Sequence, residues 1–167
     1  QSIISGSMPP LSDPVLYLKM NEGYGNTVYD SSPQKNNGIL MSQGSVPLPS
    51  WTNDGKFGKA LVFQGVGVSA SFLRTTPINI GSTVGDKMTW SMWIKPSLSQ
   101  TGGWIFRNGF STDLNSGFRI SNQSGGKYRI NLEIYDTGFK SVAGTNSILS
   151  ANQWSHLVLV YSQAEWF

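Results

Sequence analysis

The sequence of 167 residues has no cysteine, one histidine and few charged residues. Without cysteine, the chain can form no disulfide framework, no thiolate metal site and no thiol nucleophile. Charged residues make up 13% of the chain, so the polarity of its surface depends on Ser, Thr, Asn, Gln and backbone groups. The 12 Lys and Arg residues only slightly outnumber the 9 Asp and Glu residues and form no basic run, which argues against a nucleic-acid partner.

Long apolar runs are also absent. No stretch approaches the roughly 18 residues that a membrane-spanning helix needs, so we expect no membrane span. No signal peptide is visible, and in an exported protein Gln1 would follow a removed leader. The frequent Gly, Ser, Thr and Asn residues are typical of secreted proteins, so we expect an extracellular or cell-surface location.

Short segments with a two-residue apolar period fill most of the chain. Met88, Trp90, Met92 and Ile94 share one face of a strand, and no window sustains a helical period between helix caps. The predicted strands are 15–20, 39–41, 57–63, 66–72, 88–95, 104–107, 117–121, 128–135, 139–142 and 153–161. We therefore predict an all-β, two-sheet antiparallel sandwich of the jelly-roll type in residues 15–167, preceded by an extended arm in residues 1–14.

Two turn-and-strand segments, Asn21–Ser32 and Gly55–Phe63, begin a series of family motifs. The series is Tyr17-x-Lys-Met-Asn-Glu-Gly-x-Gly-Asn, Asp30-Ser-Ser, Asn37-Gly38, Gly55-Lys-Phe-Gly-Lys-Ala-Leu-Val-Phe, Thr89-Trp-Ser-Met-Trp-Ile-Lys-Pro and Asn152-Gln-Trp-Ser-His-Leu-Val-Leu-Val-Tyr. In this order the motifs resemble concanavalin-like LamG jelly-roll domains over residues 15–161. Two positions depart from the family pattern: Met20 replaces an aromatic residue, and Gln64 replaces Asp or Asn.

The family pattern continues past the Trp-x-His strand into further strands, whereas this sequence stops at Phe167. One explanation is that residues beyond Phe167 complete the sandwich. The other is that a second chain supplies the strands, because an open sheet edge is a template for strand addition. In that case the donor would be the arm with Ile3 and Ile4 or the tail with Trp166 and Phe167, and the product would be a homo-oligomer or polymer.

Catalytic residues are not evident. A sandwich glycoside hydrolase needs two carboxylates facing each other across a cleft, but Glu133 and Asp136 have a spacing that sends them to opposite faces of a strand. His156 is placed by its alternation with Trp154 on an inward face, where we expect a core imidazole bonded to a backbone carbonyl. We therefore expect a protein that is not an enzyme.

Calcium is the cofactor that the resemblance implies. Relatives often hold Ca²⁺ through turn carboxylates, and the loop from Glu22 to Asp30 supplies hard oxygen ligands. The alternative is that Asp30 caps its own Asp-Ser-Ser turn and Glu22 is solvated.

Trp93 is the leading candidate for ligand binding, because it lies opposite the apolar face of its strand. Trp104 and Tyr135 would join it if their strands are neighbours; the alternative is that a loop or the second sheet covers all three. We expect a non-catalytic module for adhesion or for recognition of glycans or surface proteins. Two alternatives are a filament or surface-layer subunit assembled by strand exchange, and an accessory domain of a longer secreted hydrolase.

Overall fold

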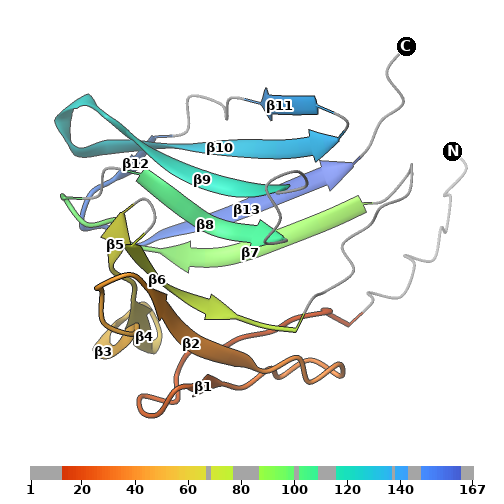
Figure 1. The fold of residues 1–167 in the computed structure, drawn as a ribbon, viewed down its shortest axis with the longest axis vertical. Coiled ribbons are helices and arrows are strands. Elements are labelled where there is room, and N and C mark those ends of the chain that lie inside the picture. The colour runs from red at the N-terminus through yellow and green to blue at the C-terminus, as the bar shows by residue number, and fades with distance from the viewer. Residues whose placement is uncertain are drawn as a thin grey trace, which may run out of the picture.

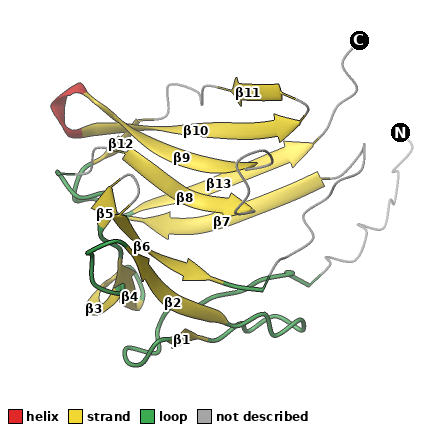
Figure 2. Cartoon of the chain, in the orientation of Figure 1, coloured by secondary structure: helices red, strands yellow, loops and turns green. Residues whose placement is uncertain are grey.

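The computed structural model describes residues 13–66, 69–76, 87–99, 102–108, 116–136, 138–142 and 148–162. Antiparallel strands make up most of these residues. The strands are β1 (Thr27–Val28), β2 (Gly38–Gln43), β3 (Ser50–Gly55), β4 (Gly58–Val62), β5 (Gly65–Val66), β6 (Ser69–Arg74), β7 (Lys87–Ile94), β8 (Gly102–Asn108), β9 (Ser116–Gln123), β10 (Lys127–Asp136), β11 (Gly138–Val142), β12 (Ile148–Ser150) and β13 (Ser155–Ser162). Within these ranges, a single 3-10 turn, Ser124–Gly126, joins β9 to β10 (Figure 2).

Two sheets pack against each other to form the main core (Figure 1). One has the strand order β11-β10-β9-β8, with β12 also paired to β10, and the other is the pair β13-β7. The buried centre consists of Phe118, Ile120, Tyr128 and Ile130, and β7 and β13 contribute Trp90, Met92, Ile94, Leu157 and Leu159. The Trp90 ring meets the Phe118 ring edge-on with centroids 4.6 Å apart. The all-β sandwich predicted from the sequence is confirmed.

The strands with the most regular alternation supply this core. Trp90, Met92 and Ile94 pack inward from β7, as predicted. Tyr128 and Ile130 do the same from β10, and the Tyr128 hydroxyl donates to the carbonyl oxygen of Ser97 at 2.7 Å. A buried phenol needs such an acceptor, because an unpaired polar group in the core is costly.

The predicted strand at 15–20 is wrong. Its segment makes only one isolated bridge, between Leu18 and Asp30, and Val15 and Tyr17 are exposed. The N–H of Tyr17 donates to the Asp30 carboxylate at 2.8 Å, and Met20 has a left-handed backbone with φ of 54°. The Asp30 side chain therefore helps to hold this segment in place, whereas the prediction assigned that role to hydrogen bonds between paired strands.

The predicted strand at 66–72 is confirmed for residues 69–72, which lie in β6, but Val66 belongs to the separate strand β5, which pairs antiparallel with β6. Gly65 has a φ of 104°, and a side chain at this position would collide with the backbone of Ser69. Ser71, predicted on the polar face, is buried. Its hydroxyl accepts from the N–H of Gln64 at 2.6 Å and donates to the Gln64 carbonyl at 3.1 Å, which makes burial of this polar side chain tolerable.

The segment Gly55–Phe63, one of the two motifs that begin the resemblance, includes β4 of the β3–β4 hairpin. The tip of this hairpin reaches the strand β7: Phe57 meets Trp93 edge-on with ring centroids 5.6 Å apart, and Asp54 forms an ion pair with Lys95. The hairpin therefore covers one end of the β7–β13 pair. No helix among the described residues is long and apolar enough to cross a membrane.

Candidate functional site

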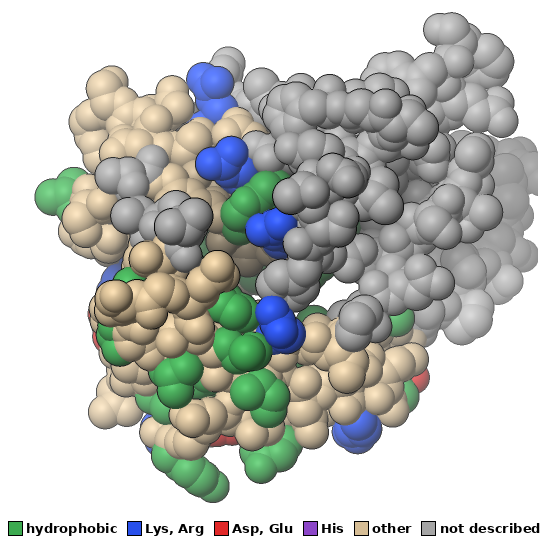
Figure 3. All heavy atoms as spheres, in the orientation of Figure 1, with side chains coloured by type: hydrophobic (Ala, Val, Ile, Leu, Met, Phe, Trp, Pro, Cys, Tyr) green, Lys and Arg blue, Asp and Glu red, His purple; other side chains and the backbone are tan. Residues whose placement is uncertain are grey.

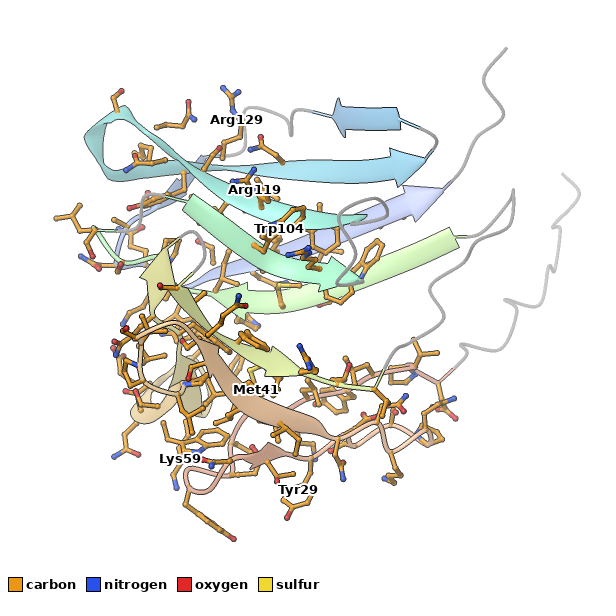
Figure 4. All side chains as sticks on the ribbon, viewed as in Figure 1. Tyr29, Met41, Lys59, Trp104, Arg119 and Arg129 are labelled. Carbon is orange, nitrogen blue, oxygen red and sulfur yellow. The ribbon has the colours of Figure 1, made fainter. Side chains whose placement is uncertain are left out.

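The outer face of β8, β9 and β10 carries two rows of side chains that point away from the core. The first row is Trp104, Arg119 and Asn131, which lie opposite one another in the strand register. The second row is Gly102, Ser121 and Arg129. Because Phe118, Ile120, Tyr128 and Ile130 face the core, the residues that alternate with them face outward. Figure 4 shows Trp104, Arg119 and Arg129 on these adjacent strands.

An irregularity in β8 places Trp104 on this face. Trp104 lies opposite Arg119 and Phe106 lies opposite Phe118, so two steps along β8 match one step along β9. This is a β-bulge, and it changes the alternation of side chains around Ile105. In a regular strand Trp104 and Phe106 would share a face. The bulge leaves Phe106 in the core and turns Trp104 outward.

Trp104 lies between two arginines. The guanidinium carbon of Arg107 is 5.7 Å from the centroid of the Trp104 ring, and that of Arg119 is 5.5 Å away. Both distances are in the range of cation–π attraction. Trp104 retains 37% of its surface, so the indole is held by its neighbours and is still accessible.

Polar groups continue the face beyond the indole. The Asn131 amide Nδ2 donates to the hydroxyl Oγ of Ser121 at 3.0 Å, which joins the two rows diagonally across β9 and β10. Gly102 contributes no side chain beside Ser121, and Arg129 completes that row. The face therefore combines an aromatic ring, guanidinium donors and an amide–hydroxyl pair.

Trp93 lies on the other side of the sandwich, on the outer face of β7. It is 38% exposed and is flanked by Phe57, by the Lys56 ammonium at 4.9 Å from the ring centroid, and by His156. Trp90 of the same strand packs inward on Phe118. The structure therefore does not bring Trp93 and Trp104 together. Phe57 packs against part of Trp93, but both indoles stay exposed, whereas the alternative prediction had a loop or the second sheet covering Trp93, Trp104 and Tyr135.

His156 is not a core residue, so that prediction is wrong. Its side chain is exposed on β13, where the ring stacks on Trp93 with centroids 5.0 Å apart and its Nε2 lies 2.8 Å from the Ser91 hydroxyl. Leu157 and Leu159 face the core, while Val158 and Val160 face outward and are exposed. Both faces of β13 are apolar, so the sequence pattern could not decide which one faces inward.

The remaining predicted residues fall wholly or partly outside the described part of the chain. For Tyr135 the structure describes the backbone alone, which lies in β10 opposite Phe139. The proposed assembly residues Ile3, Ile4, Trp166 and Phe167 all lie outside the described residues. Their predicted roles stay predictions.

Asp30 is buried and all its acceptor positions are used. Oδ1 accepts from the N–H groups of Tyr17 and Ser32, both at 2.8 Å, and Oδ2 accepts from the Asn36 N–H at 2.8 Å and the Ser32 hydroxyl at 2.6 Å. Burial opposes the charged form, but the hydrogen bonds from Ser32, Tyr17 and Asn36 outweigh it and lower the pKa of Asp30 from 3.8 to about 2. Asp30 therefore caps its own turn, as the alternative to a calcium site predicted.

Glu22 is half-buried and is not solvated as that alternative supposed. Its Oε1 accepts from the N–H of Tyr29 at 2.8 Å, while Oε2 is buried and has no hydrogen-bond partner among the described residues. Across the part of the chain that the structure describes, no three His, Cys, Asp or Glu side chains are grouped closely enough to hold a metal ion.

Sequence reasoning missed the arginines around Trp104. The alternation of β10 did place Arg129 and Asn131 opposite Tyr128 and Ile130. The alternation could not predict the strand register that places Arg119 between Trp104 and Asn131, because the paired residues lie far apart in the sequence.

Comparison with known proteins places this fold in a family. The family model described as the concanavalin A-like lectin/glucanases superfamily, Laminin_G_3, matches residues 69–166, which is more than half of the chain. The match includes β6 to β13 and therefore both Trp93 and Trp104. Searches of curated proteins and of solved structures found no match.

Proposed function

Because the chain belongs to the concanavalin A-like lectin/glucanase superfamily, we propose that it is a non-catalytic recognition module that binds glycans. The proposed site is the outer face of β8, β9 and β10 around Trp104. An extracellular or cell-surface location belongs to the same proposal, since the composition is poor in charge and rich in Gly, Ser, Thr and Asn.

The exposed Trp104 ring is the observation that carries this proposal. An accessible indole on a rigid sheet offers an apolar surface to the C–H face of a sugar, and its side chain loses little entropy on binding. Donors and acceptors for sugar hydroxyls follow on the same face, on Arg119 beside the indole and on Ser121 and Asn131 farther along. Strands position these groups more accurately than loops would.

The acidic side chains that the structure describes support a role without catalysis. Hydrolysis of a glycoside needs two carboxylates across a cleft, one of them able to give up a proton near neutral pH. Asp30 is saturated with hydrogen bonds, Asp54 is paired with Lys95, and Glu22 binds the backbone of Tyr29. None of these three lies on the face that carries Trp104.

The second candidate function is assembly of copies of this chain into a filament or surface layer. It is favoured by the outer edge of β13, to which no described strand is paired, and by Val158 and Val160, which are 51% and 74% exposed beside that edge. An accessible edge next to apolar side chains favours strand addition. Sedimentation velocity over a range of concentrations tests it: growing particles support assembly, and a monomer at all concentrations contradicts it.

A glycan array tests the primary proposal. The wild-type protein, a Trp104→Ala variant and a Trp93→Ala control are applied under the same conditions. Glycan binding that is lost in Trp104→Ala and retained in Trp93→Ala is the expected result. Binding that survives Trp104→Ala moves the site elsewhere, and a wild-type protein that retains no glycan contradicts glycan recognition. An accessory domain of a hydrolase would behave as a glycan binder in this experiment.

A further inference from the structure

Three arginines lie on adjacent strands at the face that carries Trp104: Arg107 on β8, Arg119 on β9 and Arg129 on β10. The sequences of β8 and β9 contain no Asp or Glu. On β10 the nearest acidic position is Glu133, which lies two register pairs from the row of Trp104 and opposite Gly117, in the same row as Arg107. Figure 3 shows Lys and Arg side chains following one another along this side of the molecule.

The indole orders two of these guanidinium groups. Arg107 and Arg119 both lie within cation–π distance of Trp104, so part of their side-chain freedom is already lost in the free protein. A guanidinium that lies over a ring can still offer N–H groups at its edge, and its fork matches the geometry of a carboxylate or a sulfate. Ordering before binding lowers the entropic cost of capturing such a group.

We expect a neutral sugar to bind weakly to this face. It would have to share the indole with two guanidinium groups, and its hydroxyls would make hydrogen bonds without the gain of an opposite charge. An anionic group instead meets charge-assisted donors first and can then pack its ring against the exposed part of Trp104. Asn131 and Ser121 lie within the same two rows and offer uncharged contacts to neighbouring hydroxyls.

From these contacts we infer that the site selects acidic glycans, that is, polysaccharides bearing carboxylate or sulfate groups. Arg107 and Arg119 bind one acidic group of the glycan, and Arg129 binds the next acidic group along the glycan. Trp104 orders Arg107 and Arg119 and packs against the sugar ring. This inference rests on the proposed function, because it names the ligand class of the same face.

Nucleic acid is also a polyanion, but this surface fits it less well than it fits an acidic glycan. The whole chain has a formal charge of only +3. Lys95 is paired with Asp54 at the hairpin tip, so it adds nothing to a basic stripe for a phosphate backbone. A short row of three arginines fits charges spaced along a glycan.

Affinity measurements with matched probes test the inference. The full chain is titrated by calorimetry with dextran sulfate and polygalacturonate, with neutral dextran as the uncharged control and single-stranded DNA as the other polyanion. An Arg107→Gln/Arg119→Gln variant is compared with a Lys35→Gln/Lys59→Gln variant, which loses the same charge elsewhere on the surface. We expect the arginine variant to bind the acidic glycans about tenfold more weakly, and the lysine variant to stay within about twofold of wild type.

Each outcome bears on the inference. Binding of either acidic glycan with this pattern supports it, and the preferred probe tells sulfate from carboxylate. Equal losses in the two variants, or tighter binding of DNA, would overturn it in favour of non-specific attraction to polyanions. Trp104-dependent binding of neutral dextran that the arginine variant retains would overturn the inference while leaving the proposed function intact. Failure to bind any glycan removes both. Unchanged melting temperatures exclude unfolding as the cause of a loss, because these side chains lie at the surface.

Discussion

Trp104 and Phe106 lie two residues apart on the same strand and point to opposite faces of the sheet. Trp104 contacts Arg107 and Arg119 outside, and Phe106 lies inside against Phe118, with ring centroids 5.6 Å apart. The bulge at Ile105 is what separates them. It gives the sheet an aromatic side chain on each face, with Phe106 still packed in the core.

Alanine substitutions at these two positions should therefore have unequal effects on stability. Phe106→Ala opens a cavity beside Phe118 and Trp90, and we expect it to lower the free energy of unfolding by about 3 kcal/mol. Trp104→Ala removes surface contacts and should cost less than about 1 kcal/mol. Urea unfolding followed by circular dichroism measures both. Equal losses would mean that the bulge does not direct Trp104 outward.

The hairpin tip should contribute little to global stability and much to the environment of Trp93. Phe57→Ala removes the edge-on contact with that indole, with an expected loss of about 1 kcal/mol. The emission of Trp93 should shift to the red, since water replaces the phenyl ring. A Phe57→Tyr control keeps the ring and should keep the spectrum. An unchanged spectrum in the alanine variant would place the tip away from Trp93.

Asp30 should be among the most sensitive positions of the first 60 residues. In Asp30→Asn an amide N–H₂ replaces an oxygen that accepts from two donors, so we expect a loss of about 3 kcal/mol in the free energy of unfolding. Glu22→Gln is the matched control, because its amide oxygen can still accept from the Tyr29 N–H. It should cost less than about 1 kcal/mol. Comparable losses in the two variants would contradict the assigned role of Asp30.

Acid should remove the contribution of Asp30 within a defined pH window. Its pKa is lowered from 3.8 to about 2 in the folded chain, so at intermediate pH the unfolded state binds more protons. The stabilisation is fully present above about pH 4 and is lost as the pH falls from there towards 2. Melting temperatures at pH 6 and pH 3 should differ more for wild type than for Asp30→Asn. Equal differences would show that Asp30 does not titrate in this way.

Calcium should not bind at Asp30, because its four acceptor positions are already filled. Melting temperatures measured in excess CaCl₂ and in EDTA are therefore expected to agree. A melting temperature that rises with calcium until it saturates, and that loses this response in Asp30→Asn, would contradict this expectation.

Much of the sandwich follows from alternation in the sequence. Trp90, Met92, Tyr128 and Ile130 were predicted in the core because each lies in a strand whose opposite face is mostly polar. The failures have physical causes. His156 lies in a strand whose two faces are equally apolar, and the segment around Tyr17 is held by the side chain of Asp30, which leaves no periodic trace.

The site around Trp104 was predictable only in part. Trp104 itself was identified as a candidate, but its neighbours depend on strand register and on the bulge at Ile105. A register shift of one residue would reverse which side chains face outward, and a local pattern does not encode the pairing of β8 with β9. Trp93 was placed correctly on the outer face of its strand, and the cover supplied by Phe57 comes from a hairpin distant in sequence.

The contact between that hairpin and β7 also bears on the order of folding. Phe57 and Trp93 come from segments separated by β5 and β6, so their meeting closes a long loop, which slows the step in which they join. The tip is held mainly by exposed groups, so it can open without the sandwich unfolding. Amide hydrogen exchange in β3 and β4 should therefore be faster than in β9 and β10, which would make the hairpin a separately opening unit of the fold.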